Sequence, residues 1–272
     1  MNQRFVCMLA LEDTGPVSVH DLSDRLARMV PTYPMKIETV PGESLDDPLI
    51  SLLLLVNEFP IAVMWVDRPI PLDTFDSAIR TNRLWPQARE RLREHKAYIT
   101  VGALDSCKSH QEAVQQATLV MLLSAALAEA ASTIGAYWCA GETVTEESQF
   151  VDYARSLAAE TLWPTDVWVQ LAWTKGPEQD GKRTFGLFTI GLLPFVGREL
   201  EFTPAALPPA VICLRVVATA HYLISNGPVL RDGSTVGIDP AERIRIHAHD
   251  ERVWPGVPFW TMTVEEICLE AR

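Results

Sequence analysis

One stretch of the sequence decides the fold class: residues 109–133, which read SHQEAVQQATLVMLLSAALAEAAST. Ser109 and Glu112 have the spacing of a capping box, in which the serine hydroxyl accepts a hydrogen bond from the third backbone amide and the glutamate reaches back to the cap amide. The centre, residues 117–128, is apolar on nearly every side, which is typical of a helix packed between two layers. We therefore predict a long central core helix.

Strands and helices alternate on both sides of this helix. Residues 50–56 and 59–66 are apolar runs separated by Asn57-Glu58, which predicts a β-hairpin. Towards the C-terminus, residues 208–225 predict a second long helix. Asp232-Gly233 then predicts a two-residue hairpin turn between two short strands.

The order of these elements predicts the α+β class. We expect antiparallel or mixed sheets with helices packed on one face, in two pseudo-similar βαββ-type halves around the long central helix. The N-terminal half spans residues 1–106 and the C-terminal half residues 107–272, and we expect both halves to form one compact unit.

Composition restricts the class of partner. The chain has 272 residues, of which 48% are hydrophobic, so it can bury a sizeable core. Its 23 Lys and Arg stand against 35 Asp and Glu, which gives a net charge of −12. This charge argues against a nucleic-acid partner, because phosphate backbones are bound by basic surfaces. A basic protein partner is the better expectation.

We expect no membrane partner and a cytoplasmic location. The best candidate for a membrane span, residues 48–66, is interrupted by Asn57, Glu58 and Pro60. The first residues resemble a strand rather than a secretory signal. The five cysteines form no CxxC pair, so they fit buried thiols in a reducing compartment better than a disulfide framework. They are Cys7, Cys107, Cys139, Cys213 and Cys268.

Two pairs of side chains are candidates for catalysis. His247 and His249 alternate in a strand pattern and could begin a metal site, although the same pattern suits a solvated sheet face. Glu199 and Glu201 alternate likewise, so they could serve as general acid and base with Arg198 orienting them. Alternating charge on an edge strand is the other interpretation of the two glutamates.

A cysteine nucleophile would need a neighbouring base, and Cys139 could meet His95 or His221 in space. The alternative is that all five cysteines act as small buried hydrophobes. The sequence contains no phosphate-binding glycine loop, no HExxH and no GxSxG elbow, so we expect no cofactor and assign no catalytic residue.

Acidic residues concentrate in two zones, residues 38–76 and residues 141–166. Such zones are either solvated surface or a docking face for a basic partner. For the second interpretation we predict that the partner-binding residues come from Glu43, Asp46, Asp47, Glu142, Glu146 and Glu147.

Several short motifs occur together in one order: IGAYW at residues 134–138, TFGLFTIGLLPFVGRELEF at 184–202 and GPVLRDGSTVG at 227–237. With LREHKAY at residues 92–98, they resemble the bacterial family known as domain of unknown function 4261. The sequence departs from the family pattern at residues 192–197, where a phenylalanine and a glycine are shifted. The resemblance implies no established activity and no catalytic residues. Some members resemble products encoded near bacterial toxin-secretion clusters, which implies an immunity or accessory role.

Three hypotheses follow. The first is a non-enzymatic cytoplasmic protein-binding protein, in particular an immunity protein that neutralises a secreted bacterial toxin by direct binding. The second is a metal-dependent hydrolase that uses His247 and His249 with Glu199 or Glu201. The third is an accessory or structural component of a secretion system such as type VI. The sequence leaves the oligomeric state open.

Overall fold

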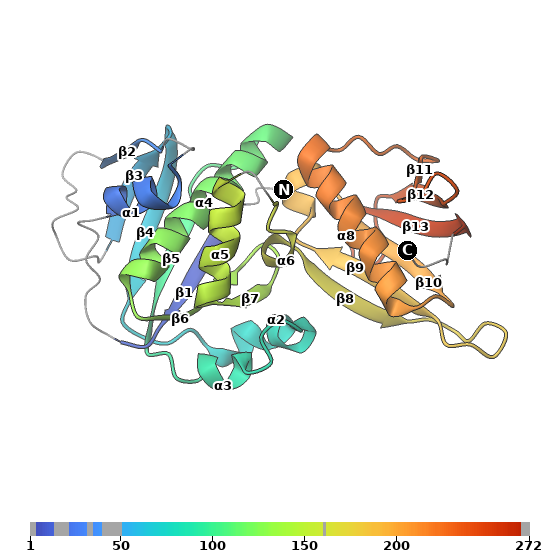
Figure 1. The fold of residues 1–272 in the computed structure, drawn as a ribbon, viewed down its shortest axis with the longest axis horizontal. Coiled ribbons are helices and arrows are strands. Elements are labelled where there is room, and N and C mark those ends of the chain that lie inside the picture. Colours follow the sequence, from blue (N-terminus) through green and yellow to red (C-terminus); the bar gives the residue numbers. More distant parts are fainter. Residues whose placement is uncertain (1–3, 14–21, 32–34, 40–50, 160–161, 268–272) are drawn as a thin grey trace. The chain divides into compact units, whose positions relative to one another are not determined.

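The computed structural model describes residues 4–13, 22–31, 35–39, 51–159 and 162–267. The chain divides into two compact units, residues 1–168 and residues 169–272 (Figure 1). The division therefore falls at residue 168 and not at the predicted 106. The reason is that residues 110–158 supply the last two strands of the first sheet and two long helices that pack on it.

The described strands of the first unit form one seven-stranded antiparallel sheet in the order β2-β3-β4-β5-β1-β6-β7. The first strand in the chain lies inside this sheet, since β1 pairs with β5 on one side and with β6 on the other. The strands are β1 (Val6–Leu11), β2 (Ile37–Thr39), β3 (Ser51–Val56), β4 (Phe59–Val66), β5 (Ala97–Ala103), β6 (Thr133–Trp138) and β7 (Thr143–Glu146).

Three helices cover one face of this sheet: α1 (Leu22–Met29), α4 (His110–Ala130) and α5 (Glu147–Ala158) (Figure 1). Alternate residues of β1 face them, because successive side chains of a strand point to opposite sides. Cys7, Leu9 and Leu11 are at most 2% exposed, and Ser124 of α4 is fully buried beneath the same sheet. The predicted central helix is therefore the core helix of the first unit.

The predicted N-terminal cap of α4 is present with one change. Ser109 Oγ accepts a hydrogen bond from the backbone N–H of Glu112 at 3.2 Å, as predicted. The Glu112 carboxylate accepts from the backbone N–H of Lys108 at 2.8 Å rather than from that of Ser109. By length and composition α4 could span a membrane, but most of it is buried inside this unit, as in the core helix of a folded domain.

A second hydrophobic cluster lies on the opposite face of the sheet, where Ala10, Tyr137 and Val144 pack against short helices. Phe75 is at its centre and makes an edge-to-face contact with Tyr137 at 5.5 Å between ring centroids. His95 fixes the neighbouring loop, since its Nε2 accepts from the backbone N–H of Ile70 at 2.7 Å. The short helices of the unit are η1 (Leu72–Phe75), α2 (Asp76–Thr81), α3 (Ala88–Leu92) and α6 (Thr165–Trp168).

The hairpin predicted at Asn57-Glu58 is confirmed. Strands β3 and β4 pair with Val56 opposite Phe59, so the turn has two residues. Asn57 and Glu58 have φ of 48° and 71°, the positive values that a type I′ turn requires.

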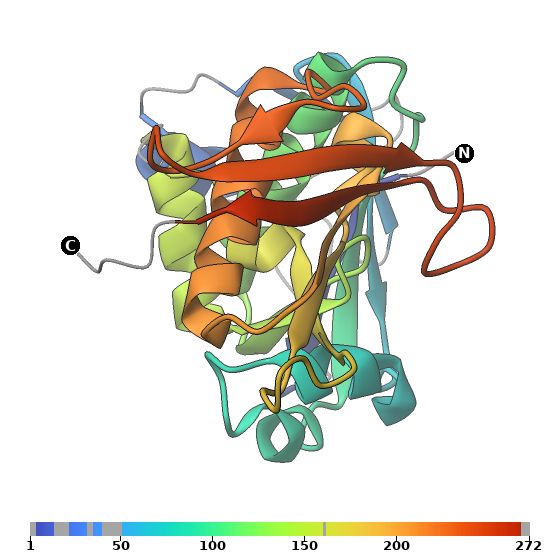
Figure 2. The same cartoon turned by 90° about the vertical axis from the view of Figure 1, so that its right-hand side faces the viewer.

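The described strands of the second unit form a six-stranded mixed sheet in the order β11-β12-β13-β10-β9-β8, in which β10 and β13 are parallel. Helix α8 packs against β9 and β10, and Figure 2 shows the long paired strands β12 and β13. The elements are β8 (Gln170–Lys175), β9 (Phe185–Ile190), α7 (Leu193–Val196), β10 (Glu199–Ala205), α8 (Pro209–Asn226), β11 (Thr235–Val236), β12 (Arg243–His249) and β13 (Phe259–Glu266).

The predicted α+β class is confirmed, whereas the similarity of two halves stays a prediction. The hairpin predicted at Asp232-Gly233 is wrong. Gly233 does occupy a turn with φ of 78°, but residues 229–230 form no strand, and Thr235 and Val236 pair with β12 instead. The sequence marked the turn correctly but not the strand that pairs beyond it.

We predict that Phe75→Ala lowers the free energy of unfolding of the first unit by about 3–5 kcal/mol, because it leaves a cavity in a fully buried cluster. Urea denaturation followed by circular dichroism measures the change. Leu84→Ala, at a side chain that is 57% exposed, is the control and should change stability by less than about 0.5 kcal/mol. Equal effects of the two substitutions would contradict the assigned cluster.

Candidate functional site

Four carboxylates gather around the end of α4 and the first turns of α5: Glu129, Glu146, Glu147 and Asp152, which we call the acidic surface. Burial raises the pKa of Glu147, and the charges of Glu129, Asp152 and Glu146 raise it further, while Arg155 opposes them. Arg155 contacts Glu129 Oε1 at 2.6 Å and Asp152 Oδ1 at 3.2 Å. Arg25 Nη1 also donates to the backbone carbonyl of Glu129 at 3.3 Å. Two guanidinium groups therefore lie near four carboxylates, and the surface keeps a negative potential.

The acidic surface contains two of the predicted partner-binding residues. Glu146 precedes α5 and Glu147 is its first residue, where the helix dipole favours negative charge. Glu142 lies at the other end of β7, half-buried with φ of 48°. Burial raises the pKa of the neighbouring Tyr137, and electrostatic interactions with Cys139 and Glu142 raise it further. The remaining predicted residues, Glu43, Asp46 and Asp47, lie outside the described residues.

Glu199 is 4% exposed and holds the turn between β9 and β10. Its carboxylate accepts four hydrogen bonds, from Thr189 Oγ1 at 2.6 Å and from the backbone N–H groups of Gly191, Leu192 and Leu193 at 2.8, 3.1 and 3.0 Å. Burial raises the pKa of Glu199 to about 7, although these four hydrogen bonds act in the opposite direction. The side chain thus satisfies three backbone amides that the turn would otherwise leave unpaired.

The predicted edge strand at Glu199 and Glu201 is wrong, because β10 lies inside the sheet between β9 and β13. Glu201 is 9% exposed and pairs with Arg252, whose Nε donates to its carboxylate. Arg198 does not orient the two glutamates. It donates instead to the backbone carbonyl of His249 at 2.7 Å and pairs with Asp250. Each glutamate therefore has its own intramolecular partners.

The histidine pair lies on β12 as the strand pattern predicts. His247 is exposed, with Nδ1 at 3.9 Å from Asp232 Oδ1, and His249 Nε2 is 3.1 Å from Thr261 Oγ1. Within the ranges that the structure describes, no group of three or more His, Cys, Asp or Glu side chains is placed to hold a metal ion.

The candidate thiols are buried or half-buried. Burial raises the pKa of Cys139 to about 12 and that of Cys107 to about 11, so the reactive thiolate is disfavoured at both. Both ring nitrogens of His95 contact backbone groups: Nε2 accepts from the N–H of Ile70, and Nδ1 contacts the carbonyl of Leu92. His221 lies on α8 in the second unit. The interpretation of these cysteines as buried hydrophobes is the one that the geometry favours.

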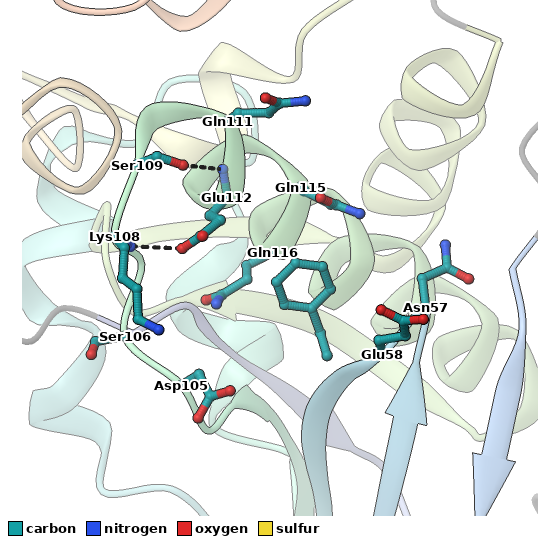
Figure 3. Close-up of a pocket in the computed structure, with 11 residues that line it drawn as sticks. Asn57, Glu58, Asp105, Ser106, Lys108, Ser109, Gln111, Glu112, Gln115 and Gln116 are labelled. Carbon is teal, nitrogen blue, oxygen red and sulfur yellow. Dashed lines mark hydrogen bonds between the residues drawn. The ribbon is translucent and has the colours of Figure 1, made fainter.

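A pocket of about 540 Å³ opens at the N-terminal end of α4 (Figure 3). Three segments line it: the turn between β3 and β4, the loop after β5, and the first two turns of α4. Asn57 and Glu58 face it from the turn, and Gln115 and Gln116 from the helix. No residue predicted as a site residue lines this pocket. Its polar residues are scattered over sixty positions of sequence, so no local motif marks it.

The comparisons with known proteins concern the second unit. Residues 188–263, from β9 to β13, match the model of the family described as Domain of unknown function (DUF4261). The resemblance seen in the sequence is therefore confirmed for this segment. No curated protein and no solved structure matches the chain.

The raised pKa of Glu199 predicts a pH dependence of stability. Because its pKa is about 7 in the folded state and 4.5 for an unperturbed glutamate, the folded state binds the proton more tightly. The contribution of Glu199 to stability is complete below about pH 4.5 and is lost as the pH rises through 7, by an amount on the order of 3 kcal/mol.

Thermal unfolding of the wild type and of Glu199→Gln between pH 4.5 and 8 measures this contribution. The variant is less stable overall, since an amide cannot accept all four hydrogen bonds, but its stability should lack the Glu199 component of the pH slope. The exposed Glu178→Gln is the matched control and should keep the wild-type slope. A variant slope identical to that of the wild type would refute the assignment.

Proposed function

We propose that the chain is a non-enzymatic protein-binding protein and that its acidic surface takes a basic protein partner. The observation that carries the proposal is the gathering of Glu129, Glu146, Glu147 and Asp152 at one place on the first unit, where Arg155 pairs with Glu129 and Asp152. Holding like charges together costs electrostatic free energy. A lysine- or arginine-rich surface would relieve this repulsion on binding.

The charge of the whole chain supports the same proposal. A net charge of −12 attracts a basic partner at long range, which raises the rate of encounter and repels acidic competitors. Such attraction is screened within about 10 Å at 0.1 M salt, so binding should weaken as salt increases.

The contacts of the predicted catalytic pair favour binding over the metal-dependent hydrolase. Glu199 is committed to the turn after β9, and Glu201 is paired with Arg252. In its specific form the proposal is an immunity protein that neutralises a secreted toxin in the cytoplasm. The family resemblance supports this form, because some members resemble products encoded near toxin-secretion clusters.

Native capture of the tagged chain from its own cells, with elution at low and then high salt, tests the proposal. We expect one stoichiometric basic protein, released by salt and toxic when produced alone. Glu146→Lys combined with Asp152→Lys should weaken capture about tenfold or more, because two attractive contacts become repulsive.

Asp73→Lys with Glu90→Lys is the control, since it changes net charge equally at exposed sites on η1 and α3. The control should bind as the wild type does. Equal losses in both double variants, or no loss in the first, would rule out the acidic surface as the binding site. Capture of a metal-bound or metabolite-bound monomer without a protein partner would reject the binding function itself.

A further inference from the structure

The pocket at the N-terminal end of α4 contains a buried polar group without a full set of partners. Gln116 is 2% exposed, and its Oε1 accepts a hydrogen bond from the Cys107 thiol at 3.2 Å. Its amide nitrogen has no acceptor among the residues that the structure describes. In Figure 3 Gln116 lies between the loop that carries Lys108 and the turn that carries Glu58. This nitrogen is a donor that an acceptor atom of a ligand in the pocket could engage.

Other lining groups also lack partners within the described chain. The carboxylates of Glu58 and Asp105 and the amides of Gln111 and Gln115 form no hydrogen bond with another described residue, and neither does the ammonium group of Lys108. The pocket therefore presents unused acceptors and unused donors side by side. The backbone that carries these side chains has a defined conformation: Glu58 lies in a type I′ turn, and the three glutamines lie on a capped helix.

The presence of both donors and acceptors in the lining indicates which class of ligand the pocket fits. A cation would pair with the carboxylates but would offer no acceptor to the amide nitrogens of Gln111, Gln115 and Gln116. An anion would satisfy the nitrogen donors but would meet three carboxylates, those of Glu58, Asp105 and Glu112. A hydroxyl group both donates and accepts, so a neutral molecule with several hydroxyls pairs with both kinds of group.

We propose that this pocket binds a polyhydroxylated ligand of the size of a mono- or disaccharide. The volume of about 540 Å³ lies within the range of small-molecule sites. Half-buried Phe59 adds one aromatic ring to the lining, against which the C–H groups of a sugar can pack. The proposal is independent of the acidic surface, which shares none of the lining residues.

Saturation-transfer NMR on the full chain tests the proposal with maltose, cellobiose, lactose and N,N′-diacetylchitobiose as probes at millimolar concentration. We expect transfer to at least one of the four disaccharides and a dissociation constant that titration calorimetry can measure. Asp105→Ala and Gln115→Ala should each weaken this binding at least fivefold. Both side chains lie at the surface of the pocket, so the substitutions leave the core of α4 intact.

Asp73→Ala and Gln87→Ala, at exposed positions outside the pocket, are the matched controls and should leave the affinity unchanged. Gln116→Leu should abolish binding, with circular dichroism to show that the helix content is retained. Absence of transfer to all four disaccharides would overturn the proposal. So would binding that survives both pocket substitutions, or occupation of the pocket by methylguanidinium in place of the sugars, which would indicate a basic side chain as the ligand.

Discussion

Burial of α4 against the first sheet is the constraint on which the first unit depends. The helix is enclosed along residues 117–128, so it needs apolar neighbours on every side. Strands β1, β5 and β6 supply one side, and α1 and α5 supply the others. The alternation of β1 follows from this, because its odd-numbered residues must be apolar to meet the helix. The pocket also depends on α4, since the helix cap fixes the position of its first two turns.

In the second unit a buried carboxylate has the corresponding role. The turn from β9 into α7 leaves several backbone N–H groups inside the protein, and Glu199 accepts from three of them. The sequence suggested a catalytic role for Glu199, whereas in the structure its carboxylate stabilises a turn. Its raised pKa therefore reflects the burial needed to close a turn and does not by itself indicate proton transfer.

The fold could be predicted from the sequence wherever a local pattern determines it. The α4 cap and the Asn57-Glu58 hairpin depend on residues a few positions apart, and both predictions hold. The place of β10 inside its sheet depends on pairing with β13, sixty residues later, so periodicity alone gave the wrong edge assignment. For the same reason, the sequence did not predict that Glu129 lies near Glu147. The pocket could not be predicted either, because its lining comes from three separate segments of the chain.

The position of β1 has a consequence for synthesis on the ribosome. Its partners are residues 97–103 and 133–138, so the central strand waits until about half the chain has been translated before its edges are paired. Forming a sheet from such distant segments is slow, because the entropy of closing long loops is lost before strand pairing offsets it. The apolar α4 segment is therefore synthesised before β6 and β7 complete the sheet on which it packs. Until those strands are added, the segment exposes apolar surface, which is the property that makes a partly synthesised chain prone to aggregation.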